Sequence, residues 1–567
     1  MNVHRPRRFV AGTVYFALVA GGLSASAVKP AAAQDQGAFG RTTIEGAWAD
    51  ASWVNSVGVI GPLPPSGADV YIGSAAFPSS FARPVAAVTL IGSRTAASLT
   101  LGRLPDDLGS LAIQSSGALT TGSLSIGAAG GDGSLTVASG GALTVTSSLF
   151  AGSADGMATI NLNAQTISVG AYTQGGPVTI NRGSNGGIQS PSFSISGGAF
   201  AIQSGDSFTV SGAVSGGATV SNSVAVNLSS NLSVSGAGTS YTAAAPIILG
   251  AGDLGVFSGA TFNANAQVTS AGGAFNVFSV AGSGATFNAN APVNVGNSNI
   301  QVSSGGVLNA SADVTTGRAV DVFGNGATLN LNAGTLAAGA LNVSSGGSAN
   351  AQDNVTLSSP LAIRSGGAFN VVQSLGDLTG LSLEGNALTI AASSSLNLAF
   401  DARRRPGTLD WAFRWQGDHA LELQSLLGTR IQTAGAPHPV SVIYNASQFG
   451  DFTYIGFIPR VGDLDGDADI DVADYLTLST NLFTNVSALT TDQSYPLGDL
   501  TADLRVDGKD FADFRTAYDE ANGAGMFVAM LQFVPEPSTI TSALLTMATL
   551  ALTLGARRRK PGQKNLL

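Results

Sequence analysis

The sequence predicts a mostly β fold, a right-handed parallel β-helix (solenoid) over residues 101–400, followed by a small helical module and a C-terminal transmembrane helix. Three observations support this prediction. A unit of 20 to 25 residues recurs, apolar and polar residues alternate within it, and only 15 charged residues fall between Leu101 and Phe400. A unit this short cannot bury its own apolar face, so successive units are expected to stack.

The repeated unit is clearest in the second half of the middle region. GATFNANAQV begins at Gly259 and GATFNANAPV at Gly284, and related segments follow in steps of 21, 21, 20 and 20 residues. Alternation such as Leu135-Thr136-Val137 predicts strands with one buried face. Gly-Gly, Ser-Gly and Asn-Gly pairs between the strands predict tight turns. The alternatives to a solenoid are an array of β-sandwiches and a low-complexity stalk.

Alignment of the units predicts two columns of stacked residues. The interior column is Phe262, Phe287, Leu308, Leu329, Ala349 and Phe369. The neighbouring column is an asparagine ladder, in which stacked amides can hydrogen-bond along the axis. It consists of Asn263, Asn288, Asn309, Asn330, Asn350 and Asn370. The sequence leaves open whether these amides point into the coil or out of it.

The predicted solenoid has a flanking segment on each side. Residues 34–100 are expected to form an N-terminal cap and the first strands, because an open end would expose strand edges and core. This segment, with Trp48 and Trp53, resembles the entry segment of autotransporter-like surface repeat proteins. Residues 401–460 are expected to form a C-terminal β cap with a short helix near 421–427 and two aromatic strands.

The segment GDLDGDADIDVADY (462–475) contains six aspartates between Asp463 and Asp474. Neighbouring carboxylates repel each other, and a bound cation reverses the sign of that energy. The spacing matches the EF-hand loop, which supplies oxygens from positions 1, 3, 5, 7, 9 and 12. It predicts a Ca²⁺ site made by Asp463, Asp465, Asp467, the carbonyl of Asp469, Asp471 and Asp474.

A second loop of the same kind begins 36 residues later, in GDLTADLRVDGKDF. Its predicted ligands are Asp499, Thr501, Asp503, the carbonyl of Arg505, Asp507 and Asp510. Ile470 and Val506, at position 8 of each loop, are expected to pack inward. Position 6, where an EF-hand has glycine, is Ala468 in the first loop and Leu504 in the second. A solvated acidic linker is the alternative to a pair of metal loops.

The pair of loops resembles a type I dockerin over about residues 462–522. Each loop starts with Gly-Asp, has Asp at position 12 and leads directly into an apolar helical pattern. The apolar residues of these expected helices are Tyr475, Leu478, Leu482 and Phe483 after the first loop and Phe511, Phe514 and Tyr518 after the second. The resemblance implies a small EF-hand-like, Ca²⁺-dependent helical module over residues 461–525 that docks onto cohesin domains. At positions 10 and 11, which contact cohesin in that family, this chain has Val472-Ala473 and Gly508-Lys509 instead of the frequent hydroxyl pair.

The N-terminal end of the chain reads as an export signal. Arg5, Arg7 and Arg8 precede an apolar stretch, and Ala31-Ala32-Ala33 fits a cleavage site, so residues 1–33 are expected to be a secretory signal peptide. An uncleaved membrane anchor and cleavage after Ala27 are the alternatives.

The C-terminal end combines three elements in order. Pro535, Glu536 and Pro537 precede the apolar segment Thr539–Ala556, and Arg557, Arg558, Arg559 and Lys560 follow it. Over residues 533–560 this order resembles the PEP-CTERM sorting signal of Gram-negative-type bacteria, which implies a membrane helix and a sorting protease. An ordinary tail anchor is the alternative. Either form places the body of the protein on the cell surface or outside the cell.

Composition and motifs limit the function. A net charge of −10, with no basic patch outside the two termini, argues against a nucleic-acid partner, and the absence of cysteine excludes thiolate metal sites. No nucleophile elbow, zinc-protease motif or phosphate-binding loop is present, and no catalytic residue is assigned. The sequence therefore favours a non-catalytic structural or adhesive protein, whose partner would be a cohesin-like protein or an extracellular polysaccharide. The alternative is a polysaccharide lyase or hydrolase displayed through the dockerin-like module.

Overall fold

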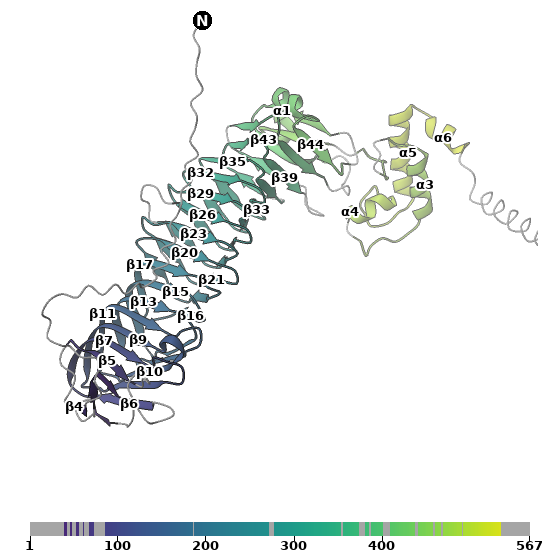
Figure 1. Ribbon diagram of the computed structural model, residues 1–567. Helices are drawn as coiled ribbons and strands as arrows, with labels where there is room; N and C mark the ends of the chain where they lie inside the picture. The colour runs from purple at the N-terminus through teal and green to yellow at the C-terminus, as the bar shows by residue number, and fades with distance from the viewer. Residues whose placement is uncertain are drawn as a thin grey trace, which may run out of the picture.

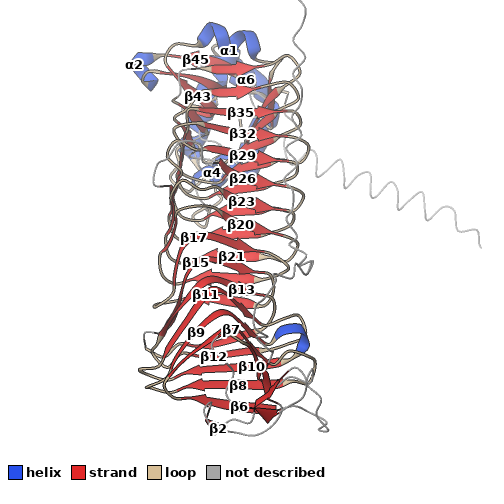
Figure 2. Cartoon of the chain, turned by 60° about the vertical axis from the view of Figure 1, so that its left-hand side comes forward, coloured by secondary structure: helices blue, strands red, loops and turns tan. Residues whose placement is uncertain are grey.

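Most of the chain is a parallel β-solenoid of about 13 turns (Figures 1 and 2). The structure is a computed structural model. It describes residues 39–41, 46–47, 53–55, 60–61, 67–72, 85–184, 186–270, 277–352, 355–372, 380–384, 387–400, 409–436, 440–457, 460–465, 469–489 and 491–533. The predicted parallel β-solenoid is therefore confirmed. The signal peptide, Asp467, Ala468 and the sorting motif with its apolar segment lie outside these residues.

Two sheets form the first part of the coil. Sheet B consists of β2 (Gly46–Ala47), β6 (Val85–Leu90), β8 (Leu108–Ile113), β10 (Asp132–Val137), β12 (Ala158–Asn161) and β14 (Val178–Asn181). Sheet A begins with β1 (Phe39–Arg41), β3 (Trp53–Asn55), β4 (Ile60–Gly61), β5 (Asp69–Ile72), β7 (Ser93–Leu101), β9 (Ala118–Ile126), β11 (Ala142–Ala151), β13 (Thr166–Gln174), β15 (Gly187–Ile195) and β17 (Ser207–Val214). The strands of these two sheets pair in parallel except at β3, which runs antiparallel to β1 and β4. The long strands β7 to β17 bend part-way along, which Figure 2 shows as stacked chevrons.

Three sheets form the second part of the coil. Sheet A continues through β20 (Leu232–Ser235), β23 (Leu254–Phe257), β26 (Val277–Ala281), β29 (Asn299–Ser303), β32 (Ala319–Phe323), β35 (Ala340–Ser344), β38 (Leu361–Ile363) and β41 (Leu388–Ile390). Sheet C consists of β16 (Ala199–Ile202), β18 (Thr219–Asn222), β21 (Ser240–Ala243), β24 (Thr261–Ala264), β27 (Thr286–Ala289), β30 (Val307–Ala310), β33 (Thr328–Leu331), β36 (Ser348–Ala351), β39 (Ala368–Val372), β42 (Ser395–Ala399) and β44 (Ile431–Ala434).

Sheet D closes the third side. It consists of β19 (Val226–Leu228), β22 (Ile247–Leu249), β25 (Val268–Ser270), β28 (Val293–Asn294), β31 (Val314–Thr315), β34 (Thr335–Ala337), β37 (Thr356–Leu357), β40 (Leu381–Leu383), β43 (Asp410–Gln416), β46 (Phe452–Phe457) and β45 (Ser441–Tyr444). The strands pair in parallel up to β43, and β46 then runs antiparallel to both β43 and β45.

The core follows directly from the alternation in the sequence. The predicted interior column is buried, from Phe262 through Phe287 to Phe369, and each member pairs with its copy in the next turn. The rings of Phe262 and Phe287 stack with centroids 4.9 Å apart. The neighbouring asparagines point outward and are partly exposed, which answers the question that the sequence left open.

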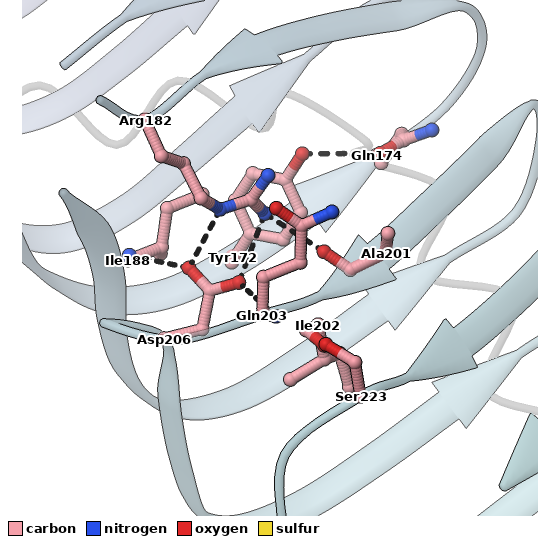
Figure 3. Close-up of polar contacts among 9 residues, drawn as sticks. All are labelled: Tyr172, Gln174, Arg182, Ile188, Ala201, Ile202, Gln203, Asp206 and Ser223. Atoms are coloured by element: carbon pink, nitrogen blue, oxygen red, sulfur yellow. Dashed lines mark hydrogen bonds and ion pairs between the residues drawn. The ribbon is translucent and has the colours of Figure 1, made fainter. Parts of the chain in front are cut away.

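Where the coil changes from two sheets to three, one series of backbone hydrogen bonds between successive strands is interrupted. β14 pairs with β12, and β16 pairs with β18, but no pairing joins β14 to β16 among the described strands. Side chains of the preceding turns bond to the carbonyl groups of β16 instead (Figure 3). The Arg182 guanidinium donates to the Ala201 carbonyl at 2.9 Å, and the Gln174 amide donates to the carbonyls of Gly197 and Ala199 at 3.0 and 3.1 Å.

Asp206 completes this polar cluster. Its carboxylate lies 2.9 Å from the Arg182 guanidinium, and it also accepts the backbone N–H groups of Ile188 and Gln203. The side chains of Arg182 and Asp206 are 9% and 0% exposed. Buried charges are tolerated where they are paired and hydrogen-bonded, so the cluster satisfies backbone groups that a continuous ladder would otherwise satisfy.

The end of the solenoid contains the expected short helix and aromatic strands. They are α1 (Ala420–Leu426), β45 and β46, and α2 (Ala446–Phe449) lies between the two strands. His419 stacks on Trp415 with ring centroids 3.5 Å apart, and its Nε2 lies 3.0 Å from the Gln416 carbonyl. Asp418 accepts the N–H of Ala420, and the Nδ1 of His419 lies 3.6 Å from the Glu422 carboxylate, so both side chains act in the local turn.

Residues 460–533 form a helical segment with a core of its own. It contains α3 (Val472–Asn481), α4 (Thr491–Ser494), the 3₁₀ turn η2 (Tyr495–Leu497), α5 (Gly508–Asn522) and α6 (Met526–Leu531). Apart from α1 and α2, the one other helical turn among the described residues is η1 (Ala128–Gly130) in the solenoid. Leu478, Phe514 and Phe527 are buried in a cluster that includes no residue of the solenoid core. Within the described part of the chain, no helix is long and apolar enough to cross a membrane.

Candidate metal centre

Each acidic loop leads directly into a helix, and two aspartates of the loop cap the start of that helix. Asp471 precedes α3 and accepts the N–H of Ala473 at 2.6 Å, while Asp474 accepts the N–H of Asp471 at 2.9 Å. Such a reciprocal pair is a capping box, which satisfies backbone donors that a helix start leaves free. Asp507 and Asp510 form the same box at the start of α5. Positions 9 and 12 of the two loops therefore have equivalent surroundings.

The hydrophobic residues of the loops hold the two halves together. Ile470 and Val506 are buried, as predicted for position 8, and both belong to the core of the helical segment. Tyr475 of α3 contacts Phe511 and Phe514 of α5, with ring centroids 6.5 and 6.3 Å apart. This contact fixes α3 and α5, and therefore the ends of both loops, in one unit.

One hydrophobic expectation was wrong. The spacing placed Phe483 on the helix after the first loop, together with Tyr475 and Leu478. The structure ends α3 at Asn481, and Phe483 follows in a left-handed conformation with φ of 67° and 81% exposure. The backbone N–H of Phe483 bonds to the Val506 carbonyl. Phe483 therefore belongs to a short backbone bridge to the second loop and not to the packed face of the helix.

The first loop brings carboxylates together. Ligand oxygens of Asp463, Asp465 and Asp474 lie within 4.8 Å of one another, and those of Asp469, Asp471 and Asp474 form a second such group. Asp474 belongs to both groups and is fully buried, while Asp463 is 4% exposed. Five of the six predicted positions of this loop are thus described, and position 12 belongs to both groups of oxygens, with Asp469 taking part through its carboxylate instead of the predicted carbonyl.

Burial makes the charge at Asp474 costly in the absence of a cation. Desolvation is the main cause that raises the pKa of Asp474 to about 6, and the charge of Asp465 acts in the same direction. Hydrogen bonds from the backbone N–H groups of Asp471, Leu464 and Asp465 oppose this rise. A divalent cation among these oxygens would favour the ionised carboxylate. The donor set contains only oxygen, the ligand type that Ca²⁺ prefers.

The second loop is built differently. Asp499 is buried and accepts the N–H groups of Asp503 and Leu504 and the hydroxyl of Ser494, at 3.1, 3.0 and 2.7 Å. Asp510 accepts the N–H of Thr501 at 2.8 Å. Lys509 lies 3.5 Å from the carboxylate of Asp503. Much of the negative charge in this loop is therefore already balanced by protein donors.

Two details of the second loop bear on a metal. The hydroxyl oxygen of Thr501 is buried and has no hydrogen-bond partner, which is the arrangement expected of a position-3 ligand whose cation supplies the missing interaction. Leu504 at position 6 has a φ of 64°, a left-handed conformation that favours glycine. Arg505, expected to contribute its carbonyl, is exposed. The second loop thus has a fitting donor at position 3 and a strained turn at position 6.

Comparison of the chain with protein-family models, with curated proteins and with solved structures gives no match. The argument about function therefore depends on the geometry of the chain itself.

Proposed function

We propose that this chain is an exported, non-catalytic structural or adhesive protein whose C-terminal helical segment binds Ca²⁺. The gathering of five aspartates of the first loop in two groups that share Asp474 is the observation that supports the proposal most directly. Like charges gathered at a buried position cost free energy unless a cation or protons compensate them. A long rod with few charged residues attached to such a segment fits a spacer better than an enzyme.

The proposed Ca²⁺ ligands differ in quality between the loops. In the first loop they are Asp463, Asp465, Asp467, the carbonyl of Asp469, Asp471 and Asp474. In the second loop they are Asp499, Thr501, Asp503, the carbonyl of Arg505, Asp507 and Asp510. Bound Ca²⁺ would supply the positive charge that lets these oxygens approach one another. The first loop should bind more tightly because its predicted side-chain ligands are all carboxylates, whereas the second loop has the neutral Thr501 and places Lys509 3.5 Å from the Asp503 carboxylate.

A docking role accompanies the calcium proposal. Two loops in register, each feeding a helix, resemble a type I dockerin, and the partner would then be a cohesin-like protein. Val472, exposed at 37%, and Lys509, whose side chain is 73% exposed, occupy two of the positions that contact cohesin in that family. Because these residues are not the frequent hydroxyl pair, the partner would be selected by an apolar and cationic surface.

Export and sorting complete the proposal. The N-terminal signal would direct the chain out of the cytoplasm. Pro535, Glu536 and Pro537, the apolar segment and the Arg557–Arg559 cluster would hold it in the inner membrane until a sorting protease acts. Both segments lie outside the described residues, so their support is the sequence pattern alone.

The alternative, a polysaccharide-degrading enzyme, receives no specific support from the described repeats. Asp206 is buried against Arg182, and Asp253 and Asp313 accept backbone N–H groups of the next turn. Asp321 accepts the amide of Asn342. These carboxylates serve the coil, and none of them faces an arginine across an open groove in the described residues.

Calorimetric titration of the intact protein with CaCl₂ tests the proposal. We expect one tight site and one weaker site, with MgCl₂ giving a weaker response because Mg²⁺ needs a stricter octahedral geometry. Circular dichroism after addition of EDTA should show a loss of helical signal while the β signal of the solenoid persists. A protein that gives no heat with Ca²⁺, and the same spectrum with and without EDTA, would refute the calcium proposal.

A further inference from the structure

The outer face of sheet C carries a continuous ladder of asparagines. Each side-chain amide donates to the amide oxygen of the previous turn at 2.7 to 2.8 Å, in six successive bonds. The members are Asn263, Asn288, Asn309, Asn330, Asn350, Asn370 and Asn397. The turns stack at about 4.8 Å, so the ladder is roughly 29 Å long. We call this surface, on strands β24 to β42, the asparagine face (Figure 1).

The ladder leaves hydrogen-bonding capacity unused. A side-chain amide has two N–H donors and two acceptor lone pairs, and the ladder uses one of each. No further bond is formed by the amides of Asn288, Asn309 and Asn330 among the described residues. In a planar amide the N–H antiparallel to the C=O lies along the ladder, so the second N–H points away from the main chain. Each of these turns therefore presents one donor and one acceptor at a regular interval.

The asparagine face is also uncharged. The second outward row on the same strands is small and neutral, and it consists of Thr261, Thr286, Val307, Thr328, Ser348, Ala368 and Ser395. No outward side chain of these described strands is charged, and none is aromatic. An anionic polymer would find no counter-charge here. A protein partner would find no aromatic or arginine anchor of the kind that dominates protein interfaces, and Val372 at the end of β39, 50% exposed, is the one strongly exposed apolar side chain of these described strands.

We propose that the asparagine face binds a linear, neutral polysaccharide that lies along the solenoid axis. Hydroxyl groups of such a polymer can both donate to the amide oxygens and accept from the outward N–H groups. The sugar units recur on a scale comparable to one turn of the coil, so many weak contacts can form together. This proposal rests on the exported, adhesive role proposed above and gives that role a ligand class and a site.

Affinity electrophoresis of the intact protein provides the test, with hydroxyethylcellulose and galactomannan as neutral probes and alginate as the anionic control. Wild-type protein should be retarded by a neutral polymer and not by alginate. The double variant Asn309→Asp and Asn350→Asp places two charges on the face, two turns apart, and should raise the apparent Kd at least tenfold. The matched control is Thr269→Asp with Thr315→Asp on sheet D, which has the same axial spacing and should bind like wild type.

A second variant separates binding from ladder stability. Thr286→Glu with Thr328→Glu adds charge to the face while the ladder stays intact, so it should lose binding without a lower melting temperature. The proposal is overturned if neither neutral polymer retards the wild type, if the sheet D control loses binding equally, or if alginate is bound best. Repeating the gels with EDTA distinguishes the two proposals, because retardation that requires Ca²⁺ would belong to residues 460–533.

Discussion

Replacing Arg182 by methionine should remove the only partner charge of Asp206 among the described residues while keeping most of the side-chain volume. Asp206 is fully buried and would retain just its two backbone donors, Ile188 and Gln203. Breaking a buried pair by removing one partner costs about 3–5 kcal/mol. The retained N–H bonds place the expected loss near the lower end, at about 3 kcal/mol. The Ala201 carbonyl also loses its donor, so the damage falls where sheet B ends and sheet C begins.

Native-state hydrogen exchange followed by mass spectrometry is the suitable assay. Repeat proteins lose stability locally, because each turn contacts only its neighbours, and a single melting temperature would average the effect away. A loss of about 3 kcal/mol corresponds to roughly hundredfold faster exchange in peptides that cover β14 to β17. Peptides from β30 to β36 should not change. Arg364→Met, at an exposed turn, is the matched control and should stay within about 0.5 kcal/mol of wild type.

A double-mutant cycle makes the reasoning refutable. Asp206→Asn removes the charge and keeps an acceptor for one of the two backbone donors, which bond to different carboxylate oxygens. Combining it with Arg182→Met should still recover part of the loss, because no unpaired buried charge remains. We expect a coupling free energy of about 2 kcal/mol between the two positions. Purely additive losses, or an Arg364→Met variant as damaged as Arg182→Met, would show that the polar cluster does not replace the missing ladder.

Three further predictions concern the calcium loops and the core. Asp474→Asn should lower the calcium affinity of the tighter site by roughly 100-fold or more in calorimetry, because even loss of a residue that only supports a metal ligand costs about 10–100-fold. Asp510→Asn should lower the affinity of the weaker site only. Leu504→Gly should stabilise residues 460–533 by about 1 kcal/mol in urea denaturation, because glycine relieves the left-handed strain at φ of 64°; an unchanged or lower midpoint would contradict this. Phe287→Ala should cost about 4 kcal/mol locally, because the ring stacks on Phe262 and meets Phe278 at 4.6 Å, and unchanged hydrogen exchange in β27 would refute the stacked core.

The repeat made the solenoid predictable because its information is local. The period of 20 to 25 residues and the alternation of apolar and polar residues are enough to place Phe262 and Phe287 in one interior column. No information from the rest of the chain is needed. Position 8 of each acidic loop was predictable for the same reason, since Ile470 and Val506 are the apolar residues between ligand positions. Phe483 was placed wrongly because helical spacing alone does not show where a helix ends.

The junction around Arg182 could not be predicted from the repeat. Asp206 stood out as one of few charges in the repeats, but its partner is 24 residues earlier in the chain. The two meet because the coil changes from two sheets to three, and this change depends on how successive turns pair. The backbone hydrogen-bond ladder stops between β14 and β16. The pattern of apolar and polar residues in these two strands does not show this.

The sequence by itself determined that identical turns stack, which residues fill the interior, and which aspartates gather before the two helices. These features follow from residue period and residue type, which act over a few positions. The tertiary structure alone decided that the asparagine ladder faces outward, that the aspartates of the two acidic loops are hydrogen-bonded differently, and that a buried ion pair replaces a missing backbone ladder. Each of these depends on which groups of distant turns and loops come within hydrogen-bonding distance, and that distance is set only when the whole coil is assembled.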